Sequence, residues 1–555
     1  MTTKRVLIVG GVAGGASCAA RLRRLDEGAE IFIFERSGDV SFANCGLPYY
    51  LGGAIAERGQ LLVATAERFR DLFNVEVRTR HEVTRIDREN RTIEVKSLQT
   101  GAVVNEPYDV LVLAPGAAPL RPSLPGIDSP GAFSLRNLDD VDRIHAWIDR
   151  RNVDRAVVVG AGYVGLEMVE NLSRRGVTVT LLEMADQVMP PVDREMAAPI
   201  QRELECQGVD LRLGNALVAI EPGPKDTIGV VAQHDERIAV ELVILAVGVK
   251  PETDLARQAG LEIGSTGGIR VDDRMRTSDP HVFAVGDAVE VRDFVTGRPA
   301  LIPLAGPANR QGRIAADAIC GRQSRYRGSQ GTAVVGVFDL TLAMTGATEK
   351  TLRKAGIPFE KSYTHSFHHA SYYPGAERIS MKLLFDPEKG RLLGAQAVGK
   401  AGVEKRIDVI AMAIQNGATV FDLEEAELCY APQYGSAKDP VNMAGFTAAN
   451  ILRGDVRVVH WSEWKRQEAA GEAPVTLDVR PSTDIAAASI PGTIRIPLGE
   501  LRSRLDELPR DREIRVHCGF GQMSYYAVRL LTQHGFQVRN LSGGFTSYEM
   551  EELRG

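Results

Sequence analysis

The segment from residue 155 to 183 constrains the fold more than any other part of the chain. A strand-like run, AVVV, leads into a G-x-G-x-x-G turn formed by Gly160, Gly162 and Gly165, and the following helical stretch and second strand end at Glu183. Such glycines let a pyrophosphate approach the helix N-terminus, and the terminal carboxylate accepts a hydrogen bond from the ribose 2′-hydroxyl. A carboxylate here also repels a 2′-phosphate. The segment therefore predicts a parallel dinucleotide-binding unit that takes NADH in preference to NADPH.

A second unit of this kind opens the chain. Its turn runs from Gly10 to Gly15 and its next strand ends at Glu35, although Val12 occupies the position of the usual second glycine. Taken alone, it could be a glycine-rich turn without a ligand. Far downstream, however, TSDPHVFAVGD ends at Asp287 and resembles a motif of flavoproteins with two dinucleotide sites, whose aspartate binds the ribitol and diphosphate region of FAD. The resemblance implies FAD on the first unit and NADH on the second.

Composition excludes several other classes of protein. The 555 residues, with 44% hydrophobic and 25% charged, are typical of a globular chain of roughly three to four domains. A net charge of −6 without a Lys/Arg stripe speaks against nucleic acid as a partner. No apolar run is long enough to predict a membrane span, and glycines interrupt the one N-terminal stretch that could be mistaken for a signal peptide. Six cysteines without a CxxC predict neither a disulfide framework nor a zinc site and favour a cytoplasmic location.

The texture of the sequence changes along the chain. Apolar strands alternate with helices up to about residue 320, which is typical of parallel α/β architecture. Residues 331–390 alternate with period two and turn at 386–387 and 389–390, so they predict an antiparallel sheet. Helical stretches then complete an α+β domain near residue 450, and the remaining chain predicts a separate α/β domain.

One cysteine stands out within SFANCGLPYY. Cys45 is single where disulfide reductases of the flavoprotein class carry a pair, so one sulfur must work with the flavin. At the start of a helix we expect its pKa to be depressed, and the thiolate is the nucleophile toward sulfur. We expect structural roles for Cys18, Cys206, Cys320 and Cys429.

Three segments, SFANCGLPYY, GGVAGG and YAPQYGSAKDPVN, resemble coenzyme A-disulfide reductases and NADH-dependent persulfide or polysulfide reductases over residues 1 to about 450. The resemblance implies a homodimer in which Cys45 forms a mixed disulfide or attacks a coenzyme A persulfide. Asn44 is also expected to contact the cofactor. A basic contact of some family members is replaced here by Leu72-Phe73. The residues that fall where the family contacts coenzyme A are Ser17, Arg21, Arg24, Ser41, Asn44 and Lys438.

Further roles follow from the same resemblance. Tyr372 and Tyr430 match tyrosines that reach over from the partner subunit, with Tyr373 as an alternative to Tyr372. Their hydroxyls could protonate or orient a leaving thiolate, or they could simply pack at the interface. Glu167 resembles a glutamate near the nicotinamide, and it could also be a helix N-terminal acid.

The last hundred residues resemble a single rhodanese domain. Its cysteine, Cys518, ends a strand and begins a loop whose N–H groups can hold an anionic persulfide. Position 524 is Ser, which speaks against a Cys-based phosphatase, because such enzymes need an Arg there. The loop 519–523 contains no Lys or Arg, which argues against thiosulfate as a good donor. An inert descendant of a rhodanese is the alternative.

Together these features predict a two-dinucleotide-binding (Rossmann-like) flavoprotein with an α+β dimerisation domain and an α/β rhodanese domain. The expected activity is NADH-dependent reduction of a persulfide, polysulfide or coenzyme A disulfide. The alternatives are an NADH oxidase or peroxidase with an accessory sulfur-transfer domain, which the Val12-Ala13 turn disfavours because those enzymes carry a histidine there, and a non-catalytic redox sensor. His365, His368 and His369 lack carboxylate or cysteine partners in sequence, so no metal is expected. The predicted domains are 1–120 with 255–325 (FAD), 121–254 (NADH), 326–452 (dimerisation) and 456–555 (rhodanese).

Overall fold

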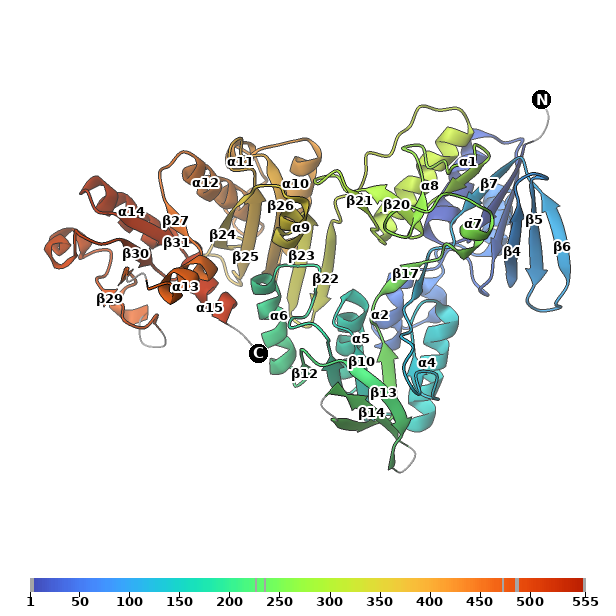
Figure 1. Cartoon of the computed structure of the whole chain (residues 1–555), viewed down its shortest axis with the longest axis horizontal. Helices are drawn as coiled ribbons and strands as arrows, with labels where there is room; N and C mark the ends of the chain where they lie inside the picture. The colour runs from blue at the N-terminus through green and yellow to red at the C-terminus, as the bar shows by residue number, and fades with distance from the viewer. Residues whose placement is uncertain (1–3, 225–226, 234–235, 472–473, 485–488, 553–555) are drawn as a thin grey trace. The chain divides into compact units, whose positions relative to one another are not determined.

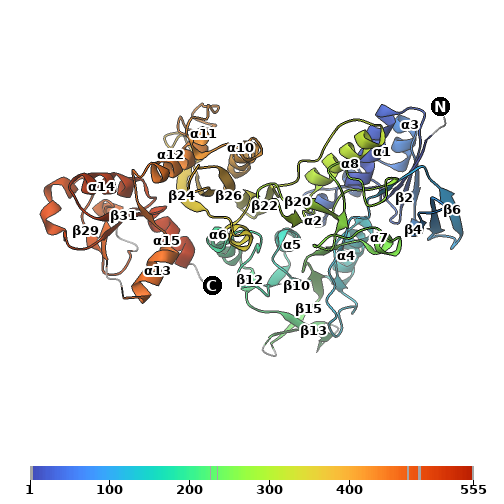
Figure 2. The ribbon, with the colours of Figure 1, turned by 45° about the horizontal axis from the view of Figure 1, so that its top comes forward.

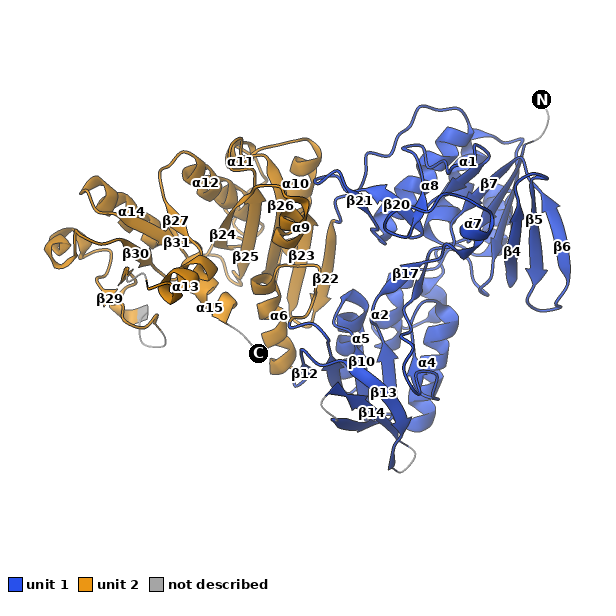
Figure 3. Ribbon diagram, viewed as in Figure 1, with its two compact units in different colours: residues 1–186, 208–331 blue, residues 187–207, 332–555 orange. Residues whose placement is uncertain are grey.

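The computed structural model describes residues 4–224, 227–233, 236–471, 474–484 and 489–552, so residues 485–488 of the rhodanese-like segment lie outside it. Contacts divide the chain into two compact units, coloured separately in Figure 3. Unit 1 comprises Met1–Asp186 and Gly208–Gly331, and unit 2 comprises Gln187–Gln207 and Thr332–Gly555. Within the described part of the chain, no helix has the length and apolar character needed to cross a membrane.

The first sheet of unit 1 is parallel and has the strand order β19-β7-β1-β2-β3. Its central strand is apolar and its interior is fully buried, as expected when helices cover both faces. Helices α1 and α8 lie side by side against this sheet in Figures 1 and 2. The elements are β1 (Arg5–Val9), α1 (Ala13–Leu25), β2 (Glu30–Glu35), β3 (Glu76–Thr79), β7 (Val110–Leu113), β19 (Val282–Ala284) and α8 (Ala305–Ile319).

The second sheet of unit 1 is also parallel, with the order β12-β11-β10-β16-β9. The predicted strand–turn–helix–strand unit is confirmed as β10, α5 and β11. The elements are β9 (Ala132–Phe133), α4 (Leu138–Arg151), β10 (Arg155–Val159), α5 (Tyr163–Arg174), β11 (Thr178–Leu182), β12 (Asp210–Arg212) and β16 (Leu242–Leu245).

Smaller elements complete unit 1. They are α2 (Leu47–Leu51), α3 (Ala66–Phe73), β4 (His81–Asp87), β5 (Thr92–Ser97), β6 (Val103–Pro107), β8 (Ala117–Pro119), β13 (Leu217–Pro222), β14 (Ile228–Ala232), β15 (Arg237–Val240), β17 (Val249–Pro251), α7 (Asp254–Gln258), β18 (Ile269–Arg270), β20 (Val289–Arg292) and β21 (Pro299–Ala300).

The first sheet of unit 2 is antiparallel, with the order β22-β23-β26-β25-β24, which confirms the sheet expected from residue 331. Asp386 makes the predicted turn between β25 and β26, because its carboxylate accepts from the backbone N–H groups of Glu388 and Lys389. The elements are α6 (Arg194–Cys206), β22 (Ala333–Val337), β23 (Leu340–Gly346), α9 (Glu349–Ala355), β24 (Glu360–Phe367), β25 (Arg378–Phe385), β26 (Leu392–Gly399), α10 (Val403–Gln415), α11 (Val420–Glu424) and α12 (Pro440–Leu452).

The second sheet of unit 2 is parallel, with the order β27-β31-β30-β28-β29. It forms the predicted C-terminal α/β domain. The elements are β27 (Val458–Val459), α13 (Trp461–Ala469), β28 (Val475–Asp478), β29 (Ile494–Arg495), β30 (Ile514–His517), α14 (Gln522–Gln533), β31 (Val538–Leu541) and α15 (Gly544–Glu552).

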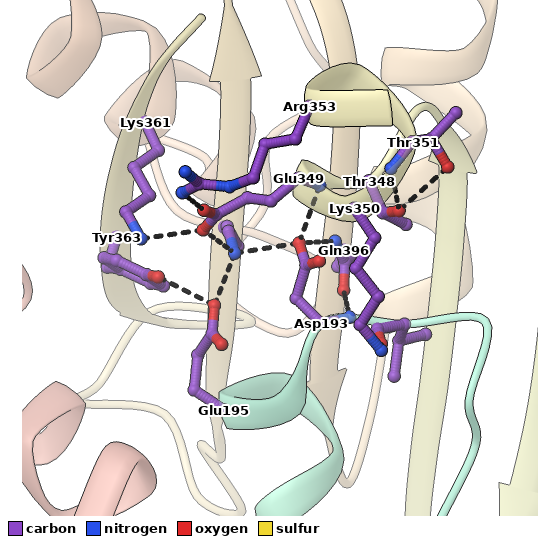
Figure 4. A network of polar contacts seen from close by, with 12 residues as sticks. Asp193, Glu195, Thr348, Glu349, Lys350, Thr351, Arg353, Lys361, Tyr363 and Gln396 are labelled. Carbon is purple, nitrogen blue, oxygen red and sulfur yellow. Dashed lines mark hydrogen bonds and ion pairs between the residues drawn. The ribbon is translucent and has the colours of Figure 1, made fainter. Parts of the chain in front are cut away.

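A buried ionic network joins the segment 187–207 to the antiparallel sheet, although the predicted range 121–254 included that segment. Figure 4 shows the carboxylates of Asp193, Glu195 and Glu349 converging. The ammonium of the fully buried Lys382 pairs with all three, at 2.8 Å from Asp193 Oδ2. Burial by itself lowers the pKa of Lys382, but these carboxylates raise it above its ordinary value. Arg353 and Lys361 also pair with Glu349, so three cations of the chain face the three carboxylates.

Candidate active site

At Gly10 and Gly15, the turn at the start of α1 leaves no room for a side chain. A Cβ on Gly10 would lie 2.1 Å from the carbonyl oxygen of Ala114, and one on Gly15 would lie 2.0 Å from that of Gly10. Glu35, at the end of β2, accepts a hydrogen bond from the backbone N–H of Gly11 at 2.9 Å. Because the next strand reaches back to the turn, its carboxylate lies at the helix N-terminus, as dinucleotide binding requires.

The turn at the start of α5 is built in the same way. A Cβ on Gly160 would lie 2.4 Å from the carbonyl oxygen of Ala246, and one on Gly165 would lie 1.8 Å from that of Gly160. Gly162, by contrast, faces open space, with no atom within 4 Å of such a Cβ. Glu183 Oε2 accepts from the N–H of Ala161 at 2.7 Å. The open space at Gly162 and the carboxylate beside it fit a pyrophosphate and an adenosine ribose.

Asp287 follows β19, and its carboxylate is a candidate hydrogen-bond acceptor for a ligand. Burial raises its pKa, an effect that Arg136 partly offsets. No described residue donates a hydrogen bond to this carboxylate, whereas the backbone N–H of the preceding Gly286 is held by Gln311 at 2.7 Å. A half-buried acceptor without a partner fits the hydroxyl groups of a bound ribitol chain.

Cys45 lies in a short 3-10 turn, Asn44–Gly46, immediately before α2. The side chain is exposed, yet its pKa is raised, first by burial around the thiol and then by the carboxylates of Glu167 and Asp287. The expected depression of this pKa is therefore wrong for the protein without cofactors. The helix that follows is only one turn long and offers little dipole, whereas two carboxylates oppose a thiolate.

Glu167 and Tyr49 form a pair beside this cysteine. The Tyr49 hydroxyl lies 3.4 Å from Glu167 Oε1, and burial raises the pKa of Glu167 to about 7. Burial and the Glu167 carboxylate raise the pKa of Tyr49 to about 12. Glu167 can therefore take up and release a proton near neutral pH. Sequence reasoning missed Tyr49, and its position four residues after Cys45 is the only signal that could have found it.

The residues expected to contact coenzyme A divide between the two units. In unit 1, Ser17, Arg21 and Arg24 follow one face of α1, and Arg21 forms an ion pair with Asp317 at 2.8 Å. Ser17 donates to the side chain of Asn309, and Arg24 is exposed. Ser41 adopts a positive φ of 48°, and Asn44 Nδ2 donates to the carbonyl oxygen of Arg136 at 3.5 Å. Lys438 is exposed in unit 2.

The structure brings the two predicted tyrosines together on unit 2. The hydroxyl oxygens of Tyr372 and Tyr430 lie 3.0 Å apart, and the two side chains are 74% and 50% exposed. The hydrogen bond to Tyr430 raises the pKa of Tyr372. Tyr373 instead packs edge-on against His369, with ring centres 5.6 Å apart. Tyr372 is thus distinguished from its neighbour as the partner of Tyr430.

Cys518 occupies a second site, between β30 and α14. The residue is buried, and its Sγ accepts hydrogen bonds from the N–H of Gly521 at 3.2 Å and from the hydroxyl of Ser524 at 3.3 Å. Ser524, seen in the sequence only as a missing arginine, is therefore a donor to the sulfur. Its six-residue spacing from Cys518, which the loop closes, was the available signal. These donors suit an anionic sulfur.

Three family models match the chain. Pyridine nucleotide-disulphide oxidoreductase matches residues 4–312, the dimerisation domain of the same family matches 332–439, and the rhodanese-like domain matches 462–551. The chain therefore belongs to the pyridine nucleotide-disulphide oxidoreductases, a family that uses FAD and NADH, and its dimerisation domain indicates a homodimer.

Individual relatives narrow the comparison. A coenzyme A disulfide reductase of Staphylococcus haemolyticus is 37% identical over 449 residues, covering 81% of this chain and all of that protein. The crystal structure of reduced Bacillus anthracis CoADR-RHD is 48% identical, with a TM-score of 0.96 and coverage of 99% and 98% of the two chains. A NAD-dependent persulfide reductase from A. fulgidus is 37% identical, with a TM-score of 0.91 and coverage of 98% and 100%.

Proposed function

We propose that this protein is an NADH-dependent reductase of coenzyme A persulfide and related persulfides, polysulfides and coenzyme A disulfide. The observation that carries the proposal is the lone Cys45, exposed beside Glu167, Tyr49 and Asp287 in the unit that carries both glycine turns. The similarity to coenzyme A disulfide and persulfide reductases supports the same activity.

Separate residues of unit 1 would bind FAD, bind NADH and hold a proton. The first turn, Glu35 and Asp287 would hold FAD, and the second turn and Glu183 would hold NADH. Bound FAD supplies the two-electron redox chemistry that links NADH to sulfur. Glu167, with its pKa of about 7, holds or releases a proton beside this site.

Cys45 is the nucleophile in this proposal. Its thiolate attacks the outer sulfur of a persulfide, a new S–S bond forms at Cys45, and the original S–S bond breaks so that its electron pair leaves with the thiolate of the carrier. Two-electron reduction then breaks that bond, releases hydrosulfide and restores the thiolate. Tyr372 and Tyr430, whose exposed hydroxyls form a pair, would orient or protonate the leaving thiolate in the homodimer. Ser17, Arg21, Arg24, Ser41, Asn44 and Lys438 would contact coenzyme A.

Cys518 is proposed to carry a persulfide to or from the reductase site. Its sulfur is buried under two donors, an arrangement that suits storage of an anionic sulfur. An NADH oxidase is less well supported, since the relatives that extend through the rhodanese region include a persulfide reductase. We place the protein in the cytoplasm, where NADH is available and thiols stay reduced.

Anaerobic turnover tests the proposal. FAD-loaded full-length protein is mixed with NADH and coenzyme A persulfide, and sulfide is measured against NADH consumed, with an oxygen-only reaction beside it. Stoichiometric sulfide with little oxygen consumption supports a persulfide reductase. Rapid NADH loss with oxygen alone, without sulfide release from the persulfide, would assign the protein to the oxidases instead.

A further inference from the structure

The turn formed by Gly543 and Gly544 lies between the dimerisation sheet and the loop that carries Cys518. A Cβ on Gly543 would lie 2.8 Å from Tyr363 Cβ and 2.9 Å from His365 Nε2, both on β24. A Cβ on Gly544 would lie 2.4 Å from the carbonyl oxygen of Cys518. Both glycines have positive φ, which lets the chain turn here against β24 on one side and against the cysteine loop on the other.

Neutral hydrogen bonds fix this contact. His365 Nδ1 lies 2.8 Å from Ser380 Oγ, and its Nε2 lies 3.0 Å from Ser547 Oγ on α15. The N–H of Tyr363 donates to Ser542 Oγ at 3.3 Å. Burial lowers the pKa of His365 to about 3, so the ring is neutral at physiological pH. The contact therefore holds the loop in place without adding charge.

A cation from β25 lies against the tip of the same loop. The guanidinium carbon of Arg378 is 3.5 Å from the ring centre of Phe520 and 4.0 Å from that of Phe367. Its Nη1 donates to the carbonyl oxygen of His365 at 2.7 Å. Arg378 is thus stacked between one aromatic ring of the dimerisation sheet and one of the cysteine loop.

Arg378 has no counterion in the part of the chain that the structure describes. Among the described residues, none forms an ion pair with Arg378, and none accepts a hydrogen bond from its Nε or Nη2. Burial lowers the pKa of Arg378. The loop 519–523 itself contains no Lys or Arg. A half-buried arginine in this state has N–H donors free for an anion.

We infer that Arg378 provides the cationic side of a binding site for an anionic sulfane-sulfur compound, formed jointly by the dimerisation sheet and the Cys518 loop. Gly521 and Ser524 bind the cysteine sulfur, and the free edge of Arg378 binds the anionic group of the donor. The inference rests on the proposed role of Cys518 as a persulfide carrier and names the class of compound that loads it.

Thiosulfate is the simplest compound of this class. The Cys518 thiolate attacks its outer sulfur, an S–S bond forms at Cys518, and the original S–S bond breaks, so that its electron pair leaves with sulfite. Cyanide then removes the outer sulfur from Cys518 as thiocyanate and restores the thiolate. In this scheme Arg378 faces the dianionic leaving group, for which the loop alone offers no cation.

Selective alkylation measures the charge at Cys518 without any sulfur transfer. Full-length protein is treated with anionic iodoacetate or neutral iodoacetamide, and alkylation of the Cys518 peptide is followed by mass spectrometry. We expect Arg378→Met to lower the iodoacetate-to-iodoacetamide rate ratio about fivefold, and Arg378→Lys to keep most of it. Arg391→Met, which removes an exposed arginine of the same domain, is the matched control and should match wild type.

Three results would overturn the inference. They are an unchanged ratio in Arg378→Met, an equal loss in Arg378→Lys, and no alkylation of wild-type Cys518 by either reagent. Thiosulfate:cyanide turnover gives a second readout, in which Arg378→Met should raise KM for thiosulfate about tenfold more than it lowers kcat. If wild type shows the alkylation preference but forms no thiocyanate, the anion site stands and the carrier role of Cys518 fails.

Discussion

The two cysteine sites place the same atom in opposite surroundings. Cys45 is exposed, and the carboxylates of Glu167 and Asp287 disfavour its thiolate. Cys518 is buried, and its sulfur accepts hydrogen bonds from Gly521 and Ser524. Burial and two carboxylates raise the pKa of Cys45, whereas two hydrogen-bond donors face the sulfur of Cys518.

This difference fits different proposed roles for the two sites, one in the turnover of sulfur and the other in its storage. At Cys45 the resting thiolate is disfavoured, and we propose that reduction of the bound sulfur drives the cycle forward. A site that binds an anionic sulfur can retain a persulfide between encounters. Under the proposed function, the fusion joins a cysteine that turns over with one that stores sulfur.

The largest expected effect is the loss of reductase activity in Cys45→Ser. Sulfur-dependent NADH oxidation should fall about a thousandfold, because the serine hydroxyl cannot take up sulfane sulfur. Turnover with coenzyme A persulfide measures this, while flavin reduction by NADH stays intact. Cys206→Ser, at an exposed position of unit 2, is the control and should keep wild-type turnover. Residual sulfur activity near wild type would end the mechanism at Cys45.

Lys382→Met should destabilise the antiparallel sheet of unit 2 and leave the strands of unit 1 unaffected. The substitution removes the one cation that pairs with all three carboxylates, and breaking a buried pair costs about 3–5 kcal/mol. Hydrogen exchange of the β25 amides should accelerate accordingly, while the strands of unit 1 keep their protection. Lys389→Met changes an exposed residue in the turn that follows the same strand and should have no effect. Equal protection in the two variants would show that the network does not stabilise the sheet.

Ser524→Ala tests the proposed storage of sulfur at Cys518. Loss of one hydrogen bond to a charged sulfur costs about 1.5–3 kcal/mol, so persulfide at Cys518 should fall roughly tenfold at equilibrium with coenzyme A persulfide. Mass spectrometry of the Cys518 peptide measures it. Ser503→Ala, on the exposed surface of the same domain, should retain the wild-type level. Unchanged persulfide in Ser524→Ala would remove the hydroxyl from the account.

The smallest effect concerns the pKa of Cys45. Removing the Glu167 carboxylate lowers this raised pKa, so more thiolate is present at any pH below it. In Glu167→Gln we therefore expect iodoacetamide to alkylate Cys45 about threefold faster at pH 8, with the pH profile displaced to lower pH. Glu170→Gln removes a neighbouring carboxylate that acts on Glu167 and Tyr49 but not on Cys45. A profile unchanged in Glu167→Gln would exclude the electrostatic cause.

Much of the fold could be predicted because it depends on local sequence patterns. The turn at Gly160 and the carboxylate of Glu183 follow from spacing within one strand–helix–strand unit, and the period-two segment after residue 331 forms the expected sheet. The pair of Tyr372 and Tyr430 was predicted only through family resemblance, since 58 residues separate them.

The surroundings of both cysteines could not be predicted, because they depend on contacts between distant residues. Glu167 lies 118 residues from Tyr49, yet the two form the pair beside Cys45 and help to raise its pKa. The rule for a cysteine at the start of a helix uses only the local sequence, and it therefore predicted a lowered rather than a raised pKa for Cys45. Similarly, nothing near Cys518 in sequence points to Arg378, which reaches its loop through sheet packing.

The most direct test of the division between turnover and storage follows one sulfur atom through both cysteines. Full-length protein is loaded with coenzyme A persulfide without NADH, and the Cys518 peptide is weighed before and after anaerobic addition of NADH. We predict that wild type gains one sulfur atom at Cys518 and loses it as sulfide when NADH is added, whereas Cys45→Ser gains the sulfur and keeps it. Loss of this sulfur at the same rate in Cys45→Ser, or its retention in wild type after NADH, would contradict the account.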